Sequence, residues 1–119
     1  MLTFAEIERA LVVTAHPDDV ELKVIENGGA FALGPFGLRY VSLAHSIPDM
    51  NAVVIDTPHG RIFHTGDWKL DDQPVLGPTV NPEDIKAIGK EGVFALVCDS
   101  TNAFNAGASG TEGSVRDGL

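Results

Sequence analysis

The chain has 119 residues, enough for one small domain, and 44% of them are hydrophobic, so its composition supports a packed core. Its net charge of −9, from 8 basic and 17 acidic residues, argues against a free-standing nucleic-acid-binding domain, which neutralises phosphates with clustered Lys and Arg. A nuclease that reaches phosphates through bound metal ions is not excluded. The single cysteine, Cys98, rules out an intramolecular disulfide. With no signal-peptide pattern and no apolar run of about 20 residues, this favours a cytoplasmic protein without a membrane span.

The first part of the chain predicts one short helix followed by strands. Thr3 and Glu6 form a capping box for a helix ending near Arg9. The apolar run 11–14 predicts a buried strand, and Pro17 makes its end a loop. Asn27-Gly28-Gly29 is a turn signal. The further strands expected from apolar patterning are residues 20–26, 31–33 and 38–44.

The second part predicts a hairpin, a loop, a helix and a buried strand. Residues 52–56 and 61–64 read as strands joined by a Thr-Pro-His-Gly turn. After a loop over 71–82, Asn81 as N-cap and Pro82 at the first position predict a helix that ends near Gly89 or Gly92. The continuous apolar run 93–98 predicts a strand buried on both faces, in which Cys98 is an inert thiol. No closing element is expected after Asn102. Strands with one late helix predict an α/β fold, a piece of an α/β sandwich.

Two residues at predicted strand ends are candidate metal ligands. His45 ends one strand, and Asp67 follows another after the hairpin. Neighbouring strands bring their ends together, and an imidazole with a carboxylate suits zinc or manganese. A bridging carboxylate also suits a two-metal site that activates water. His59 is expected in a solvated turn. His64 is expected to be a buried, hydrogen-bonded histidine, with a supporting role beside the metal site as the alternative.

Four sequence motifs resemble those of ribonuclease J, a family of the metallo-β-lactamase superfamily with a β-CASP insertion. They are Leu-Ala-His-Ser-Ile-Pro-Asp at 43–49, His-Thr-Gly-Asp-Trp-Lys at 64–69, Cys-Asp-Ser-Thr-Asn at 98–102 and Ser-Gly-Thr-Glu at 109–112. The resemblance covers about residues 20–119. It implies an αββα sandwich that hydrolyses RNA with two zinc ions, or manganese or magnesium, in an enzyme that forms homo-oligomers. By the same resemblance His45 is a zinc ligand, Asp67 bridges two metals, and Asp99-Ser100-Thr101 marks the exit toward the β-CASP domain.

The chain departs from this family in the ligands that it lacks. The main metal motif, His-x-His-x-Asp-His, and the last ligand histidine do not occur in the sequence. Catalytic zinc takes three or more protein ligands, so catalysis by this chain alone is not expected. The expected organisation is a segment of uncertain origin over 1–19, a partial metallo-β-lactamase-like domain over 20–102, and a truncated connection toward a missing β-CASP domain over 103–119.

A second resemblance occupies the N-terminal segment. The run Leu-Val-Val-Thr-Ala-His-Pro-Asp-Asp at 11–19 is similar to the zinc motif of LmbE/PIG-L-type N-deacetylases. That resemblance implies that His16 and Asp19 bind zinc and that Asp18 is the general base. The two resemblances meet at residues 19–22, and we hypothesise that the sequence is a junction there. The alternative to both enzymes is a non-catalytic partial domain, whose uncovered sheet face favours association with other molecules.

Overall fold

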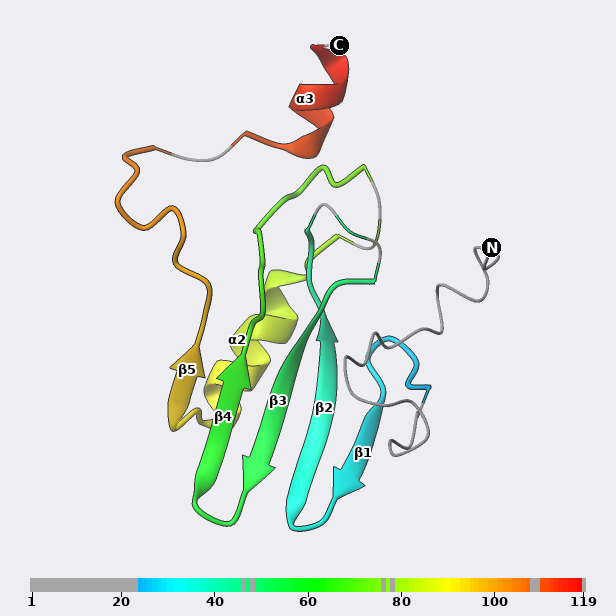
Figure 1. The fold of residues 1–119 in the computed structure, drawn as a ribbon, viewed down its shortest axis with the longest axis vertical. Helices are drawn as coiled ribbons and strands as arrows, with labels where there is room; N and C mark the ends of the chain where they lie inside the picture. The colour runs from blue at the N-terminus through cyan, green and yellow to red at the C-terminus, as the bar shows by residue number, and fades with distance from the viewer. Residues whose placement is uncertain are drawn as a thin grey trace, which may run out of the picture.

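Five strands form one mixed sheet in the order β1-β2-β3-β4-β5, and two short helices accompany it (Figure 1). The computed structural model describes residues 24–45, 47, 49–75, 77, 79–107 and 110–118. The strands are β1 (Ala30–Leu33), β2 (Phe36–Ser42), β3 (Asn51–Thr57), β4 (Gly60–His64) and β5 (Ala95–Val97), and the helices are α2 (Pro82–Glu91) and α3 (Glu112–Asp117). Pairing is antiparallel from β1 to β4 and parallel between β4 and β5. The predicted α/β class is therefore confirmed at this level, whereas the predicted sandwich needs a second layer that these elements do not supply.

The β3–β4 hairpin forms where the turn signal predicts it. The hydroxyl of Thr57 donates to the Gly60 carbonyl at 2.7 Å and accepts from the His59 N–H at 3.1 Å. Gly60 has a φ of 138°, and a Cβ there would lie 2.9 Å from the Phe94 Cβ, so both backbone conformation and space require glycine. His59 is exposed, as predicted.

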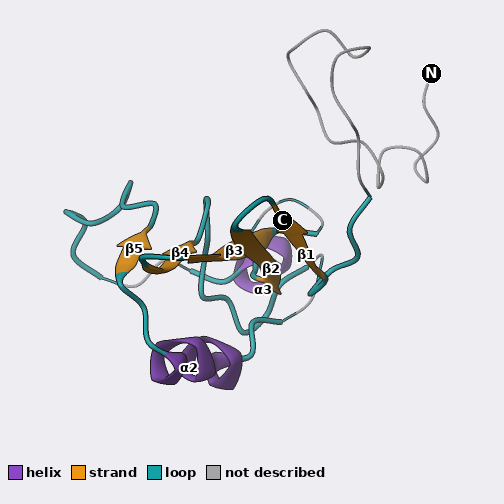
Figure 2. Ribbon diagram, turned by 90° about the horizontal axis from the view of Figure 1, so that it is seen from below, coloured by secondary structure: helices purple, strands orange, loops and turns teal. Residues whose placement is uncertain are grey.

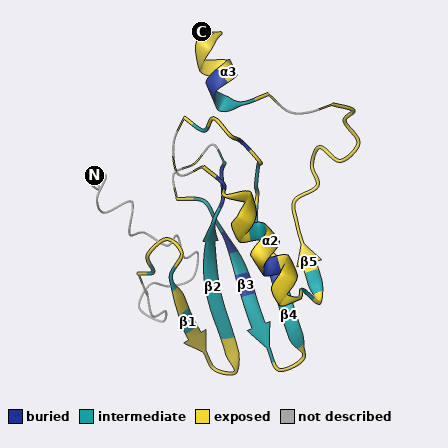
Figure 3. Ribbon diagram, turned by 180° about the vertical axis from the view of Figure 1, so that it is seen from behind, coloured by how far each residue is buried: buried dark blue, intermediate teal, exposed yellow. Residues whose placement is uncertain are grey.

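Helix α2 begins and ends at the predicted residues. The Asn81 side chain accepts from the Glu83 N–H at 3.1 Å, and Pro82 takes the first helical position. Gly92 ends the helix with a φ of 91°, and its N–H donates to the Gly89 carbonyl. The helix runs across one face of the sheet (Figure 3), where its Ile88 is 2% exposed.

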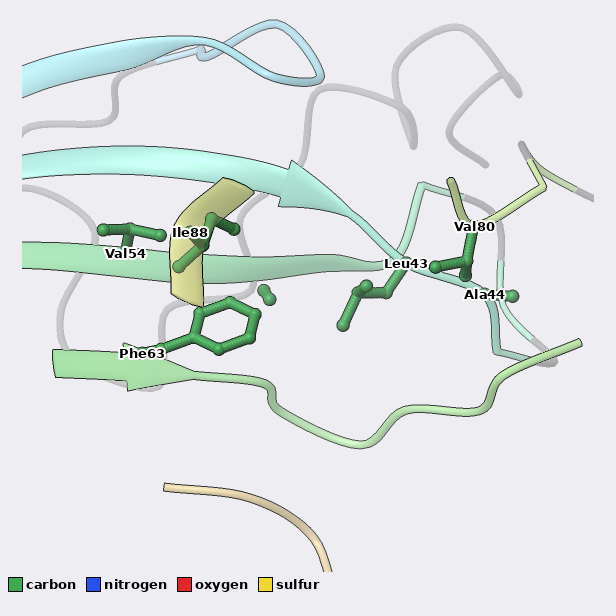
Figure 4. Packing of buried hydrophobic residues seen from close by; sticks show 7 residues of the cluster. Leu43, Ala44, Val54, Phe63, Val80 and Ile88 are labelled. Carbon is green, nitrogen blue, oxygen red and sulfur yellow. The ribbon is translucent and has the colours of Figure 1, made fainter. Parts of the chain in front are cut away.

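The hydrophobic core lies between α2 and that face of the sheet. Cross-strand partners point to the same side of a sheet, and the paired residues Val54 and Phe63 both point toward α2. The buried apolar residues form one cluster (Figure 4): Leu43, Ala44, Ala52, Val54, Phe63, Val80 and Ile88. The opposite face contributes no residue to it, so the described core has a single layer.

An ion-pair network fixes the C-terminal end of α2 to the sheet. Glu91 accepts from Arg39 of β2 at 2.8 Å and also from Arg61 of β4. Arg61 in turn bonds Asp56 of β3 at 2.6 Å, which is the first cause of a raised Arg61 pKa. Because these groups are partly exposed, the network orients the helix more than it stabilises the fold.

Four sequence predictions about secondary structure and burial are wrong. Strand β5 has only three residues, and Leu96 is 60% exposed, because no described layer covers it. Cys98 is exposed rather than buried for the same reason. Residues 24–26 of the predicted strand 20–26 are irregular. The C-terminal part does contain a closing element, α3, whose N-cap Thr111 accepts from the Ser114 N–H.

Two predicted elements lie outside the described residues: the helix over 3–9 and the strand over 11–14. None of the helices within the described ranges is long and apolar enough to cross a membrane.

Candidate functional site

The direction of the strands brings three motif-bearing loops to one end of the sheet. β2, β4 and β5 all run the same way, so the segments that follow them leave from the same edge (Figure 1). These segments contain His45, Asp67 and Asp99. β2 and β4 are not neighbours, as the sequence suggested, because β3 lies between them.

A backbone pairing beyond the strands brings two of these loops together. The Lys69 N–H donates to the Ala44 carbonyl at 2.9 Å, in an isolated antiparallel bridge. His45 therefore adjoins the bridge on one segment, and Asp67 precedes it by two residues on the other. The foundation is buried, with Ala44 3% and Thr65 1% exposed, whereas His45 is half-buried and Asp67 is exposed. A buried backbone thus carries two more accessible polar side chains.

The loop after β5 joins the same region. The Thr65 N–H donates to the Val97 carbonyl at 2.9 Å, which ties the end of β5 to the exit of β4. Asp99 then accepts from the hydroxyl and the N–H of Thr101. The hydroxyl bond, then the N–H bond, hold the Asp99 pKa below its ordinary value of 3.8, and His45 adds an electrostatic contribution in the same direction.

Asp99 is thus an additional acidic group beside His45. The sequence marked it only as the start of an exit segment, because its Asp-Ser-Thr context is also an ordinary turn motif. Its position directly after a strand that runs parallel to β4 is the signal that could have identified it.

The described residues supply only part of a metal-ligand set. Within the ranges that the structure describes, no group of three or more His, Cys, Asp or Glu side chains is placed to hold a metal ion. An imidazole and carboxylates gathered at one sheet edge suit zinc in donor type, but their number falls short of a catalytic site. His16, Asp18 and Asp19, the alternative ligands and base, lie outside the described residues.

His64 differs from its prediction. Its side chain is exposed rather than buried, because the last residue of β4 points to the face of the sheet that α2 does not cover. It is hydrogen-bonded, since its Nδ1 accepts from the Gly66 N–H at 3.0 Å. Gly66 has a φ of 63°, so the imidazole supports the tight turn that leads to Asp67.

Sequence reasoning missed Asp71, which fastens the C-terminal helix to this region. Its side chain is 1% exposed and accepts from Lys69 Nζ at 3.0 Å. It also accepts from the backbone N–H groups of Gln73 at 2.9 Å and Glu112 at 2.8 Å. The Glu112 carboxylate returns a bond to the Val75 N–H at 2.9 Å. We call this set of bonds the Asp71 clamp.

The clamp leaves Asp71 well satisfied as an anion. The Glu112 N–H bond is the main cause of a pKa below the ordinary 3.8, with further lowering from Gln73 and Lys69 against the opposing effect of burial. Its partner lies 41 residues further along the chain, so no local pattern announces it.

Comparison with known proteins identifies the family. The ribonuclease J of Sinorhizobium meliloti is 44% identical to this chain over 101 residues, which cover 85% of the chain and 18% of the relative. The ribonuclease J of Thermus thermophilus is 40% identical over 98 residues, 82% of the chain and 17% of the relative. The chain belongs to the ribonuclease J family, as one part of such a protein.

A third relative extends the match toward the N-terminus. Ribonuclease J2 of Bacillus subtilis is 33% identical over 114 residues, which cover 96% of the chain and 20% of the relative, so the match runs into residues 1–23. The chain therefore spans about a fifth of the length of these ribonuclease J relatives. No family model matches it.

Proposed function

We propose that this chain forms part of the RNA-hydrolysing centre of a ribonuclease J, to which it contributes His45 and Asp67 as metal ligands. The observation that carries the proposal is the Ala44–Lys69 bridge, which joins the two motif-bearing loops at one end of the sheet. The similarity to ribonuclease J supports the substrate class, an RNA phosphodiester.

The donor chemistry limits what the chain does alone. Asp67 is exposed and His45 half-buried, so both are accessible to a ligand. A bound pair of zinc ions would supply an activated water and stabilise charge on the phosphate. Because the described residues provide too few donors, we expect neither tight metal binding nor hydrolysis from the chain by itself. The cytoplasm is the compartment that we propose.

The finer fold proposal is that the sheet forms half of an αββα sandwich. Support comes from the one-sided core, in which α2 covers one face and no described helix covers the other (Figure 2). A sheet in this architecture is covered on both faces. In the complete protein a second sheet would pack about 10 Å from this one.

A chimera tests the function directly. The matching stretch of the Thermus thermophilus ribonuclease J is replaced by residues 24–118 of this chain, and hydrolysis of RNA is measured. We expect an active chimera in which Asp67→Ala lowers hydrolysis by about a hundredfold or more. The matched control, Asp72→Ala, removes another exposed carboxylate and should leave the rate unchanged.

The two parts of the proposal fail in different ways. A folded but inactive chimera would refute the ribonuclease function of this chain. An active chimera that tolerates Asp67→Ala would refute the ligand assignment alone.

A further inference from the structure

The face of the sheet that α2 does not cover is apolar across its whole width. Register places one residue from each strand in a single row on this face: Phe31, Leu38, Ile55, Ile62 and Ala95. All five are half-buried. We call this side of the sheet the open face. A row without a polar member on an uncovered sheet is unusual, since antiparallel sheets with one wet face alternate apolar and polar residues.

The remaining positions of the open face are also uncharged at neutral pH. A second row contains Tyr40, Val53, His64 and Val97, and beyond the first row Leu33 pairs with Phe36 at the β1–β2 turn. By contrast, Arg39, Asp56 and Arg61, which are the Arg and Asp residues of the five strands, all point to the α2 side and bond each other or Glu91. The charged groups of the sheet are therefore segregated to one side, as in a sheet whose other side is buried in its working state.

The aromatic residues of the open face give it a rigid raised edge. The rings of Phe31 and Tyr40 stack with their centroids 6.4 Å apart and their planes at 24°. Leu33 and Phe36 next to them are 60% and 41% exposed. Stacked aromatic rings offer large apolar area at low cost in side-chain entropy, which suits a protein interface.

We propose that in the isolated chain the open face is covered by the open face of a second copy, in a two-fold symmetric β-sandwich. Five strands spaced by about 4.8 Å, with five to seven residues in the longer ones, give a face of about 20 by 20 Å. Two such faces remove on the order of 800 Å² of flat surface from water, and more once side-chain relief is counted. This lies below the usual 1,200–2,000 Å² of stable complexes, so the dimer should dissociate at micromolar concentrations.

Charge makes a separate demand on this dimer. Each copy carries a net charge of −9, so association brings together two anionic chains. The uncharged open face keeps the fixed charges at the periphery of the contact, where salt screens them. The dimer should therefore tighten as ionic strength rises, opposite to an assembly held by ion pairs. This proposal does not depend on the ribonuclease function.

Sedimentation of the complete 119-residue chain tests the proposal, with Ile55→Lys and Phe36→Lys as variants of the open face. The control is Val115→Lys, which places the same charge on α3 at a residue that is 65% exposed. We expect a monomer–dimer equilibrium that each open-face variant weakens by about tenfold or more and that the control leaves unchanged. Phe36 lies at a turn and is partly exposed, so its substitution tests the contact without disturbing the core; circular dichroism verifies the fold of each variant.

Several outcomes would overturn the proposal. A monomer at 100-micromolar concentration, on the order of one hundred times the expected dissociation range, would mean that another part of the chain covers the face. Larger species would indicate pairing through strand edges, which does not close. A dimer that tolerates both open-face substitutions, or that weakens with added salt, would place the interface elsewhere.

Discussion

At the scale of single residues, Asp71 explains how the C-terminal helix is attached. Its carboxylate is buried, yet it accepts one ammonium and two backbone N–H groups. A buried carboxylate is stable only when such donors compensate for lost water. The residue therefore connects the loop after β4 to the first turn of α3, and its removal should release that turn before it affects the sheet.

Asp71→Asn is expected to loosen α3 selectively. The amide keeps the size of the side chain but loses the charge, and its NH₂ group competes for the position that the Glu112 N–H occupies. Amide exchange at Glu112 and Gly113 should become about tenfold faster or more, while exchange in β3 stays unchanged. The matched control is Asp72→Asn at the exposed neighbour. Equal protection in both variants would show that the clamp does not hold α3.

The lowered pKa of Asp71 predicts the pH at which the clamp weakens. Because its pKa is below 3.8 in the folded chain, the unfolded chain binds more protons in that range. The contribution of Asp71 is therefore complete above about pH 5 and is lost as pH falls below 3.8 toward the folded pKa. The difference in urea midpoint between the wild type and Asp71→Asn should be constant from pH 7 to 5 and shrink between pH 4 and 3. A difference that grows on acidification would contradict this sign.

At the scale of secondary-structure elements, helix α2 holds the sheet together through a single buried contact. Ile88 is the helix residue that is buried in the core, with Ile85 packed beside it. A sheet with one covered face depends on that cover for most of its buried apolar area.

Ile88→Ala should remove a large share of the stability. Truncating a buried isoleucine costs about 2–5 kcal/mol, and small domains are stable by only about 5–15 kcal/mol. Urea unfolding followed by circular dichroism measures the difference in free energy. Lys86→Ala on the exposed side removes only the pair with Glu83 and should cost less than about 0.5 kcal/mol. Comparable losses in the two variants would mean that α2 does not pack as described.

The elements that sequence predicted well are those with local signals. The hairpin turn around Gly60 and the caps Asn81 and Gly92 are each decided by the conformation of one or two residues. The burial of β5 and Cys98 was predicted wrongly because burial depends on the neighbouring layer, which an apolar run cannot reveal. Asp71 was missed since its partners are far away in sequence. His45 and Asp67 were singled out by motif, but the bridge that joins their loops needed coordinates.

At the scale of the whole molecule, the chain's metal chemistry follows from its size. It spans about a fifth of its ribonuclease J relatives, and its described part gathers fewer than three donors for a metal.

We therefore expect no saturable binding at micromolar zinc in a calorimetric titration of the chain. His45→Ala and His16→Ala variants identify the source of any binding that does occur. One tight zinc ion lost with His45→Ala would refute the expectation and show a complete site at the sheet edge. One lost only with His16→Ala would locate the site in the N-terminal segment.

The Asp71 clamp also changes what it means to cut this chain. Phe104, in the exposed stretch 99–107, is fully accessible and offers chymotrypsin a cleavage point. The piece released by that cut would still be fastened through Glu112 and Gly113 to Asp71 and Gln73. Two polypeptides would then migrate together until acid or denaturant separates them. The connection after β5 is thus dispensable as a covalent link, and a partner supplied as a separate polypeptide could use the same anchor.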